Sequence, residues 1–336
     1  MSTLHGGPDA LGVPRWDFST NANACGPAPA AWRAVQAADA MRYPDPGYEA
    51  LREALAALHG VASQRIVLAG SASEFIVRLS LAVAQQAPGA AVHAPRPGYG
   101  DYAAAARAAG LAMAASPHHA ALIWHTEPGS PEGRSSPLPE GLPGVLRVVD
   151  CAYAPLRLHG EAPPLPADAW TLWSPNKALG LTGVRGAYAV APEAALHDDA
   201  LRSRVEALAP SWVLGAHAVA MLDAWTQHET QQWVRDSLAT LRHWKAAQLA
   251  GCTALGWACE PSDTPFFVAR WPDALPPPTQ LLSRLRERGL KLRDAASLGR
   301  PGAVRLSVQP PAAQQALAAL WRELVVPQAL AGEGRR

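Results

Sequence analysis

Short apolar runs alternate with segments of helical periodicity through much of the chain. The runs at 66–68, 91–93, 121–124, 145–149 and 187–190 consist mainly of Val, Leu, Ile and Ala, and they predict strands. Helices are predicted at 48–59 and 99–109. A third follows the turn at 70–73, where Phe75, Ile76, Leu79 and Val83 share one helical face. Strands that alternate with helices favour an α/β fold, a mostly parallel sheet covered by helices on both faces.

The remaining chain divides into an arm, a helical region and a second strand-rich region. Residues 195–250 have the pattern of helices, including a long connector. After Gly251, strands are predicted at 266–269, 290–293 and 304–308, and helices at 278–288 and 312–324. Residues 1–44, rich in Gly, Pro and Asn, are expected to form an irregular arm. The predicted boundaries are 1–44 for the arm, 45–225 for a large domain and 226–331 for a small C-terminal α+β domain.

The composition is that of a soluble globular protein without a strongly charged partner. The 336 residues are 49% hydrophobic and 17% charged, with a formal net charge of +1, so neither nucleic acid nor a membrane surface is expected as a partner. No signal-peptide pattern opens the chain. The apolar stretch at 207–225 contains Pro210, His217 and Asp223, which disfavours a membrane span. The four cysteines lack CxxC spacing and are expected to be small buried residues in a reducing cytoplasm. No metal site is expected.

Lysine is scarce in this sequence, and its scarcity draws attention to the lysines that remain. There are three, Lys177, Lys245 and Lys291, against many more arginines. A lysine retained in such a chain is a candidate for chemistry that arginine cannot perform. Formation of an imine is one example, because a guanidinium stays charged and is not nucleophilic.

Polar residues gather where the predicted strands end. They lie in the turn at 70–73, in 95–102 around Tyr99 and in 148–153 around Asp150. A further polar segment, 174–188 around Lys177, leads into the predicted strand at 187–190. Each segment also has an ordinary structural interpretation: a helix cap with Glu74 in the first turn, a core tyrosine, a turn residue and a surface lysine. In 303–308, Arg305 lies on the opposite strand face from its apolar neighbours, so it points either into a cleft or to solvent.

Taken in order, these segments resemble the fold-type I pyridoxal-5′-phosphate (PLP) enzymes of the class I/II aminotransferase family. The segment S-P-N-K-A-L-G-L-T-G-V-R-G-A-Y at 174–188 is similar to that family's lysine signature, and V-V-D-C-A-Y at 148–153 is similar to its D-E-A-Y. The resemblance implies a three-layer αβα large domain with a mostly parallel sheet, a smaller C-terminal α+β domain, and PLP as cofactor.

The resemblance also implies a role for each matching residue. Lys177 would form the Schiff base and carry the proton at Cα, and Asp150 would pair with the pyridinium nitrogen. Cofactor contacts would come from the phosphate-binding residues Ser71, Ala72, Ser73, Ser174 and Arg185, from the ring-stacking residue Tyr99, and from Tyr153 and Ser130 near the 3′-oxygen.

The N-terminal arm resembles one branch of the family. His5-Gly6-Gly7, the segment 16–23 with Asn21, and the segment 42–48 with Tyr43 are similar to the threonine-phosphate decarboxylases of cobalamin biosynthesis and the histidinol-phosphate aminotransferases. This resemblance implies that Asn21 lies near the substrate carboxylate, and the wider family resemblance implies that Arg305 grips it. The imidazole of His5 and the backbone N–H groups of the arm at Gly6 would suit a second anion. It also implies that Tyr43 reaches the cofactor phosphate of a partner subunit in a homodimer.

Several positions depart from the family pattern and leave the reaction open. The family's N-P-N-N-P-T-G is E-P-G-S-P-E-G at 127–133, so Ser130 replaces a longer asparagine, and Gln309 stands where the decarboxylases carry a second arginine. The turn at 70–73 is one residue shorter than the family's, and Pro8 replaces the asparagine of H-G-G-N. Decarboxylation and transamination both remain possible, as does a catalytically degenerate PLP-fold binding protein. A Rossmann-type dehydrogenase is disfavoured because no GxGxxG follows a predicted strand.

Overall fold

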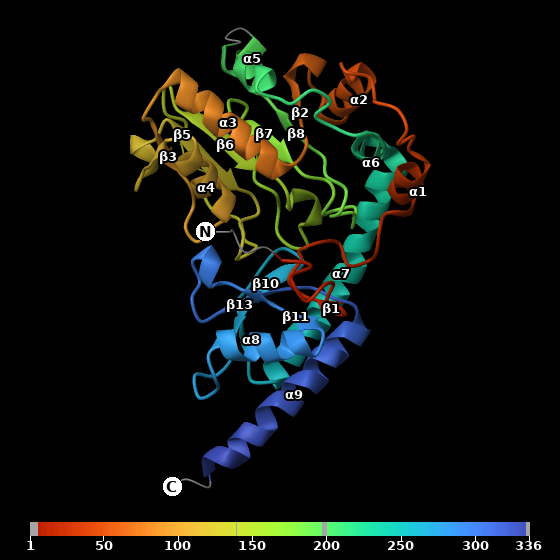
Figure 1. The fold of residues 1–336 in the computed structure, drawn as a ribbon, viewed down its shortest axis with the longest axis vertical. Helices are drawn as coiled ribbons and strands as arrows, with labels where there is room; N and C mark the ends of the chain where they lie inside the picture. Colours follow the sequence, from red (N-terminus) through yellow and green to blue (C-terminus); the bar gives the residue numbers. More distant parts are fainter. Residues whose placement is uncertain (1–5, 139, 197–199, 334–336) are drawn as a thin grey trace.

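The computed structural model describes residues 6–138, 140–196 and 200–333, with side chains up to residue 325. Two main sheets organise these residues (Figure 1). A seven-stranded sheet fills the upper half of the view and a four-stranded sheet the lower half. Helix α7 (His228–Ala254) runs from one to the other. Within the described ranges, no helix combines the length and the apolar character that crossing a membrane requires.

The large sheet is mostly parallel, as the sequence predicted. Its strands are β2 (Ile66–Ala69), β3 (Ala91–His93), β4 (Ala112–Met113), β5 (Leu122–Thr126), β6 (Leu146–Asp150), β7 (Trp170–Trp173) and β8 (Ala187–Val190), and their spatial order is β2-β8-β7-β6-β5-β3-β4. Only β8 runs antiparallel to its neighbours, β2 and β7. Strands β2 and β8 are buried along their whole length, which explains their continuous apolar sequences.

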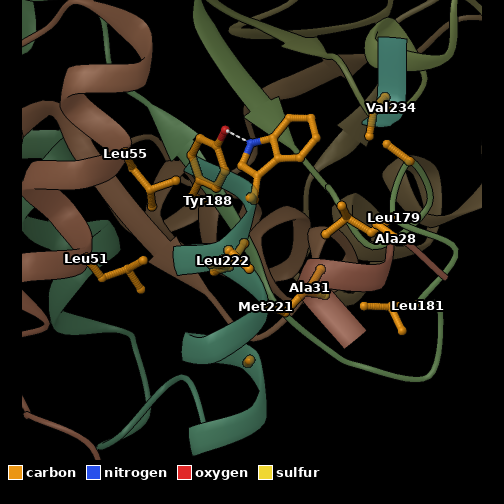
Figure 2. Close-up of a cluster of buried hydrophobic side chains, with 14 of the residues drawn as sticks. Ala28, Ala31, Leu51, Leu55, Leu179, Leu181, Tyr188, Met221, Leu222 and Val234 are labelled. Atoms are coloured by element: carbon orange, nitrogen blue, oxygen red, sulfur yellow. Dashed lines mark hydrogen bonds between the residues drawn. The ribbon is translucent and has the colours of Figure 1, made fainter. Parts of the chain in front are cut away.

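Helices cover both faces of this sheet and give three layers. Adjacent residues of a strand point to opposite faces: Val67 belongs to one apolar cluster and Leu68 to the other. The first cluster takes side chains from α3 (Ala72–Gln86), α4 (Gly100–Ala108) and α5 (Ala200–Ala207). The second, shown in Figure 2, takes them from α1 (Pro29–Ala37), α2 (Glu49–His59), α6 (Ala216–Thr226) and α7.

The small sheet is antiparallel and packs on three helices. Its strands are β9 (Ala258–Cys259), β10 (Phe266–Arg270), β12 (Arg293–Asp294) and β13 (Val304–Ser307), in the order β12-β13-β10-β9. Helices α8 (Pro278–Glu287) and α9 (Pro311–Glu333) and the end of α7 share a core with it, built around Phe267, Leu285, Leu306 and Trp321. In the arm, β1 (Trp16–Asp17) pairs with β11 (Leu290–Lys291) and ties the chain start to this region. Short 3-10 helices occupy Ser63–Arg65, Pro117–His119, Ala154–Leu156, Glu193–Leu196 and Ala296–Leu298.

Two predictions of secondary structure were wrong, and four short strands were missed. The arm contains helix α1, whose run of alanines favours a helix and whose Pro29 fits its first turn, where no backbone N–H is needed. The predicted strand 290–293 is two short strands, β11 and β12, which belong to different sheets. Strands β1, β4, β7 and β9 were not predicted; each is short, and β7 follows a proline-rich loop.

A buried polar node joins the large sheet to the helices on one of its faces. The hydroxyl of fully buried Tyr188 accepts a hydrogen bond from Trp225 Nε1 at 3.1 Å and lies 2.8 Å from His59 Nε2. In Figure 2 the dashed line from the labelled Tyr188 to an indole nitrogen marks this hydrogen bond. Burial lowers the pKa of His59 to about 4. The neutral ring can therefore accept the Tyr188 proton, and both ends of the node are satisfied.

This node predicts a pH-dependent contribution to stability. Between about pH 6.5 and 4 the unfolded chain binds a proton at His59 that the folded chain does not, so stability falls as the pH falls through this window. The loss from pH 7 to about pH 4.5 should be on the order of 2 kcal/mol. His59→Gln, measured by urea unfolding at both pH values, should remove this part of the dependence. The exposed control His228→Gln should keep it. Equal slopes in all three proteins would contradict the assignment.

Candidate active site

The polar residues singled out in the sequence meet at one edge of the large sheet. Asp150 is the last residue of β6, the turn at 70–73 follows β2, and Lys177 lies four residues beyond β7. These three strands point the same way, because β8 reverses direction between β7 and β2. Their carboxyl ends therefore share an edge, which is where α/β folds bind ligands.

Asp150 is a buried carboxylate with a specific set of donors. One oxygen accepts from the Tyr102 hydroxyl at 2.7 Å and the other from the Ala152 backbone N–H at 2.9 Å. Tyr102 is fully buried, lies 3.1 Å from the Thr126 hydroxyl and stacks on Trp124. Burial raises the pKa of Asp150, whereas the Tyr102 hydrogen bond and the positive charge of Lys177 lower it.

Lys177 projects toward the same space. Its Nζ donates to Ser174 Oγ at 3.0 Å and lies 5.7 Å from the ring centre of Tyr153. Burial lowers the pKa of Lys177; the charge of Asp150 opposes that shift, and the charges of Arg185 and Arg305 add to it. A lowered pKa increases the fraction of neutral amine, the form that attacks a carbonyl.

A second group lies where the small sheet faces this edge. Arg305 of β13 is buried and donates to Ser130 Oγ and to the Ser19 carbonyl, each at 3.2 Å. The Asn21 amide lies 3.4 Å from the Tyr153 hydroxyl. With its oxygen on this side, Asn21 accepts from Arg305 Nε and Nη1 at 3.3 Å. The structure thus brings Asn21, Ser130, Tyr153 and Arg305 together.

Arg293 is a buried cation of this region that the sequence interpretation missed. It is the register partner of Arg305 on β12, and its Nη2 donates to Ser297 Oγ at 2.8 Å. Burial, followed by the charge of Arg305, lowers the pKa of Arg293 to about 10. The alternation Leu290-Lys291-Leu292-Arg293 was the available signal. The pairing of this segment with 304–308, however, belongs to the tertiary structure and cannot be read from the local sequence.

The turn at 70–73 begins helix α3 with a capping arrangement. Ser71 Oγ accepts from the Glu74 N–H at 3.1 Å, and Glu74 in return accepts from the Gly70 N–H. This is the structural alternative considered for the turn, and it leaves the Ser71 hydroxyl proton available to an anion. The first-turn N–H groups of Ala72 and Ser73 have no acceptor within the helix, which suits an anion as well.

The Ser73 hydroxyl, in contrast, is engaged. It donates to Asp101 Oδ2 at 2.7 Å, and the Tyr99 hydroxyl donates to the same oxygen at 2.6 Å. A hydroxyl has one proton, so Ser73 can offer an anion its backbone N–H but not this proton. Asp101 was not recognised in the sequence. The bond also fixes the orientation of Tyr99 beside the start of α3.

The remaining predicted residues lie at the margin of this group or outside it. Arg185 is exposed, and its charge acts on Lys177. Tyr43 is 77% exposed and stacks on Trp212, with ring centres 4.3 Å apart. Gly6 packs so closely on the Ser19 carbonyl that a Cβ there would lie 2.2 Å from the oxygen. His5 lies outside the described residues.

Comparison with known proteins identifies the family of this chain. Residues 15–320 match the family model "Aminotransferase class I and II". The chain is 31% identical over 323 residues to a histidinol-phosphate aminotransferase of Ruegeria pomeroyi, covering 87% of this chain and 86% of the relative. It is 30% identical to one of Nitratidesulfovibrio vulgaris strain Hildenborough, covering 87% and 83%.

Solved structures share the fold at lower identity. The L-threonine-O-3-phosphate decarboxylase of Porphyromonas gingivalis superposes with a TM-score of 0.74 at 21% identity, covering 92% of this chain and 98% of that one. The histidinol-phosphate aminotransferase of Sinorhizobium meliloti, solved with pyridoxal-5′-phosphate, gives 0.78 at 20% identity, covering 96% of both chains.

Fold, site and comparisons together define a fold-type I, PLP-dependent enzyme. The chain belongs to the class I and II aminotransferase family. Three groups that suit the cofactor meet at one edge of the large sheet. They are the partly buried amine of Lys177, the buried carboxylate of Asp150 with its hydroxyl donor Tyr102, and the N-terminus of α3 with its free N–H groups. The dehydrogenase alternative is thereby set aside.

Proposed function

We propose that this enzyme acts on a small amino acid that carries both a carboxylate and a phosphate ester, such as O-phospho-L-threonine. The pair of buried guanidiniums, Arg293 and Arg305, carries the proposal. Burying a cation is costly unless an anion meets it, and the described hydrogen-bond partners of Arg305 are neutral. Arg293, the register partner of Arg305 on the neighbouring strand, adds a second buried positive charge, and two positive charges suit a substrate with two anionic groups.

In this proposal each residue of the site has a defined task. Bound PLP supplies an electron sink for the electrons released at the substrate Cα. Lys177 would hold the cofactor through Nζ and then move the proton at Cα, and Asp150 would hold the proton of the pyridine nitrogen. The residues proposed to fix the cofactor are Ser71, Ala72, Ser73 through its N–H, Tyr99, Ser130, Tyr153, Ser174 and Arg185.

Anion binding on the substrate side would fall to the small sheet and the arm. Arg305 would grip the carboxylate with its planar fork, supported by Asn21. Arg293, together with the arm around His5 and Gly6, would meet the phosphate. The four described cysteines are free thiols, which supports a reducing cytoplasm as the location.

Transamination of histidinol phosphate is the second candidate. The curated relatives at about 30% identity carry that name and align along most of the chain. The H-G-G arm and Arg305, which is placed to bind a carboxylate, favour decarboxylation over transamination. Such a decarboxylase would act in cobalamin biosynthesis. Product analysis distinguishes the two: carbon dioxide from O-phospho-L-threonine, or a keto product from an amino donor and acceptor pair.

The first prediction concerns the covalent link. Borohydride reduction of the PLP-loaded protein should fix the cofactor to the peptide that contains Lys177, because its Nζ donates to Ser174 Oγ and interacts electrostatically with Asp150. Lys177→Arg keeps the charge and should lose the label. Peptide mass spectrometry that finds the cofactor on Lys245 or Lys291 would overturn the assignment.

The second prediction concerns the phosphate. Arg293→Met should weaken the binding of O-phospho-L-threonine by about 10- to 100-fold, which corresponds to the loss of a charge-assisted hydrogen bond. The binding of L-threonine should be unchanged. Binding is read from the absorbance of the bound cofactor. Arg270→Met, which removes a more exposed arginine of β10 that bonds the Pro301 carbonyl, serves as the control. Phosphorylated and plain amino acids that bind wild type equally well would refute the two-anion substrate.

The third prediction concerns assembly, since a homodimer with shared sites is part of the proposal. Met41 and Tyr43 are 95% and 77% exposed, and neighbouring Trp212 is 43% exposed, so a large apolar surface is open in the single chain. Mixing Tyr43→Phe with Lys177→Ala subunits should restore about a quarter of the wild-type sites, because each mixed dimer contains one site with both native residues. A mixture no more active than its parents, or an active monomer in sedimentation at micromolar concentration, would contradict sharing.

A further inference from the structure

The loop between β5 and β6 carries the residue that holds Arg305, and its sequence is one of the departures from the family pattern. It begins at Glu127, directly after β5, and reaches Ser130, whose Oγ lies 3.2 Å from Arg305 Nη1. A loop that presents one hydroxyl to one guanidinium must be held in place. Three sets of contacts hold this one.

The first contact is a buried ion pair at the start of the loop. Glu127 is 2% exposed, and its Oε1 accepts from Arg157 Nη2 and from Ser135 Oγ. His125 Nε2 lies 3.9 Å from the other oxygen. Burial alone would raise the pKa of Glu127, but the His125 and Ser135 contacts and the charge of Arg157 keep it below its usual value. Glu127 is therefore ionised and charge-paired.

The second contact joins the middle of the loop to the small sheet. Arg300, in the segment between β12 and β13, donates to Glu132 of the loop at 2.5 Å and also to Glu260, which precedes β10. The same segment reaches the chain before Tyr99, where the Gly98 N–H donates to the Leu298 carbonyl at 3.1 Å.

The third contact closes the loop at Gly133. Its φ of +69° is a glycine conformation, and a Cβ there would lie 2.2 Å from Thr264 Oγ1. The Asp263 N–H donates to the Gly133 carbonyl at 2.6 Å. Buried Lys245 of α7 fixes this turn by donating to the carbonyls of Ser262 and Thr264.

We propose that Glu127 and Arg157 are positioning residues for substrate binding: their buried ion pair fixes the loop so that Ser130 holds Arg305 in the orientation that grips the substrate carboxylate. The proposal rests on the proposed function only in assigning the carboxylate to Arg305. Because a buried charge without its partner is strongly unfavourable, this pair specifies the loop position more tightly than a neutral pair would. Neither residue need touch the substrate.

The test compares two ligands that differ only in the carboxylate, O-phospho-L-threonine and 1-amino-2-propanol phosphate. In the PLP-loaded enzyme, Glu127→Gln should weaken the binding of O-phospho-L-threonine by about tenfold. The binding of 1-amino-2-propanol phosphate should be unchanged. Asp168→Asn is the matched control, because it removes an ion pair with Arg147 of the neighbouring strand β6. The double variant Glu127→Gln with Arg157→Met leaves no buried carboxylate without its arginine at this position, since Asp263, the other carboxylate near Arg157, is partly exposed. It should bind the first ligand better than Arg157→Met alone.

Hydrogen exchange of the loop supplies a readout independent of the ligands. The Gly129 and Gly133 N–H groups, bonded to the carbonyls of Arg134 and Gly129, should exchange faster in Glu127→Gln and at the wild-type rate in Asp168→Asn. Unchanged exchange, or faster exchange with equal losses for both ligands, overturns the positioning role. A wild-type enzyme that binds neither ligand refutes the proposed substrate class instead, and the exchange rates still decide whether Glu127 anchors the loop.

Discussion

A buried carboxylate at the end of a central strand is the constraint on which the rest of the site depends. Asp150 can stay ionised there only if donors and a cation compensate for the lost water. Tyr102 from α4, the backbone after β6 and Lys177 from the loop after β7 supply them. The sheet order β7-β6-β5 makes this possible, because it places Lys177, Asp150 and Thr126 on adjacent strands or just beyond their ends. The aromatic layer of Tyr99, Tyr102 and Trp124 then closes the site from one side.

The small sheet contributes buried positive charges to the site, in addition to the buried carboxylate of the large sheet. Arg293 and Arg305 are both buried, and burial, followed by the charge of Arg305, lowers the pKa of Arg293. This region is bound to the large sheet by polar contacts: Arg300 bridges Glu132 and Glu260, and the turn at 262–264 seats Gly133. The altered sequence at 127–133 therefore makes specific contacts of its own, since its two glutamates each have an arginine partner. That observation weighs against a degenerate binding protein.

The sequence was sufficient to predict five of the seven strands of the large sheet and the nature of the chemistry, because short apolar runs and an ordered set of polar residues are local signals. It was insufficient wherever partners are distant in the chain. The role of Arg293 follows only from its register with Arg305. The role of Tyr102 follows only from its hydrogen bond to Asp150, 48 positions away. The scarcity of lysine does not by itself distinguish Lys177 from the other two lysines. Lys245 holds two carbonyls and Lys291 pairs with Asp9, so each of the three lysines has a specific partner.

The protonation state of the cofactor nitrogen tests the role of Asp150 most directly. Nitrogen-15 NMR of the enzyme loaded with PLP labelled at the pyridine nitrogen reports that state without any turnover. With Asp150 ionised beside it, the nitrogen should be protonated in the wild type at neutral pH and unprotonated in Asp150→Asn, whose amide has no charge to hold the proton. The same chemical shift in both proteins would contradict the central role assigned to this carboxylate.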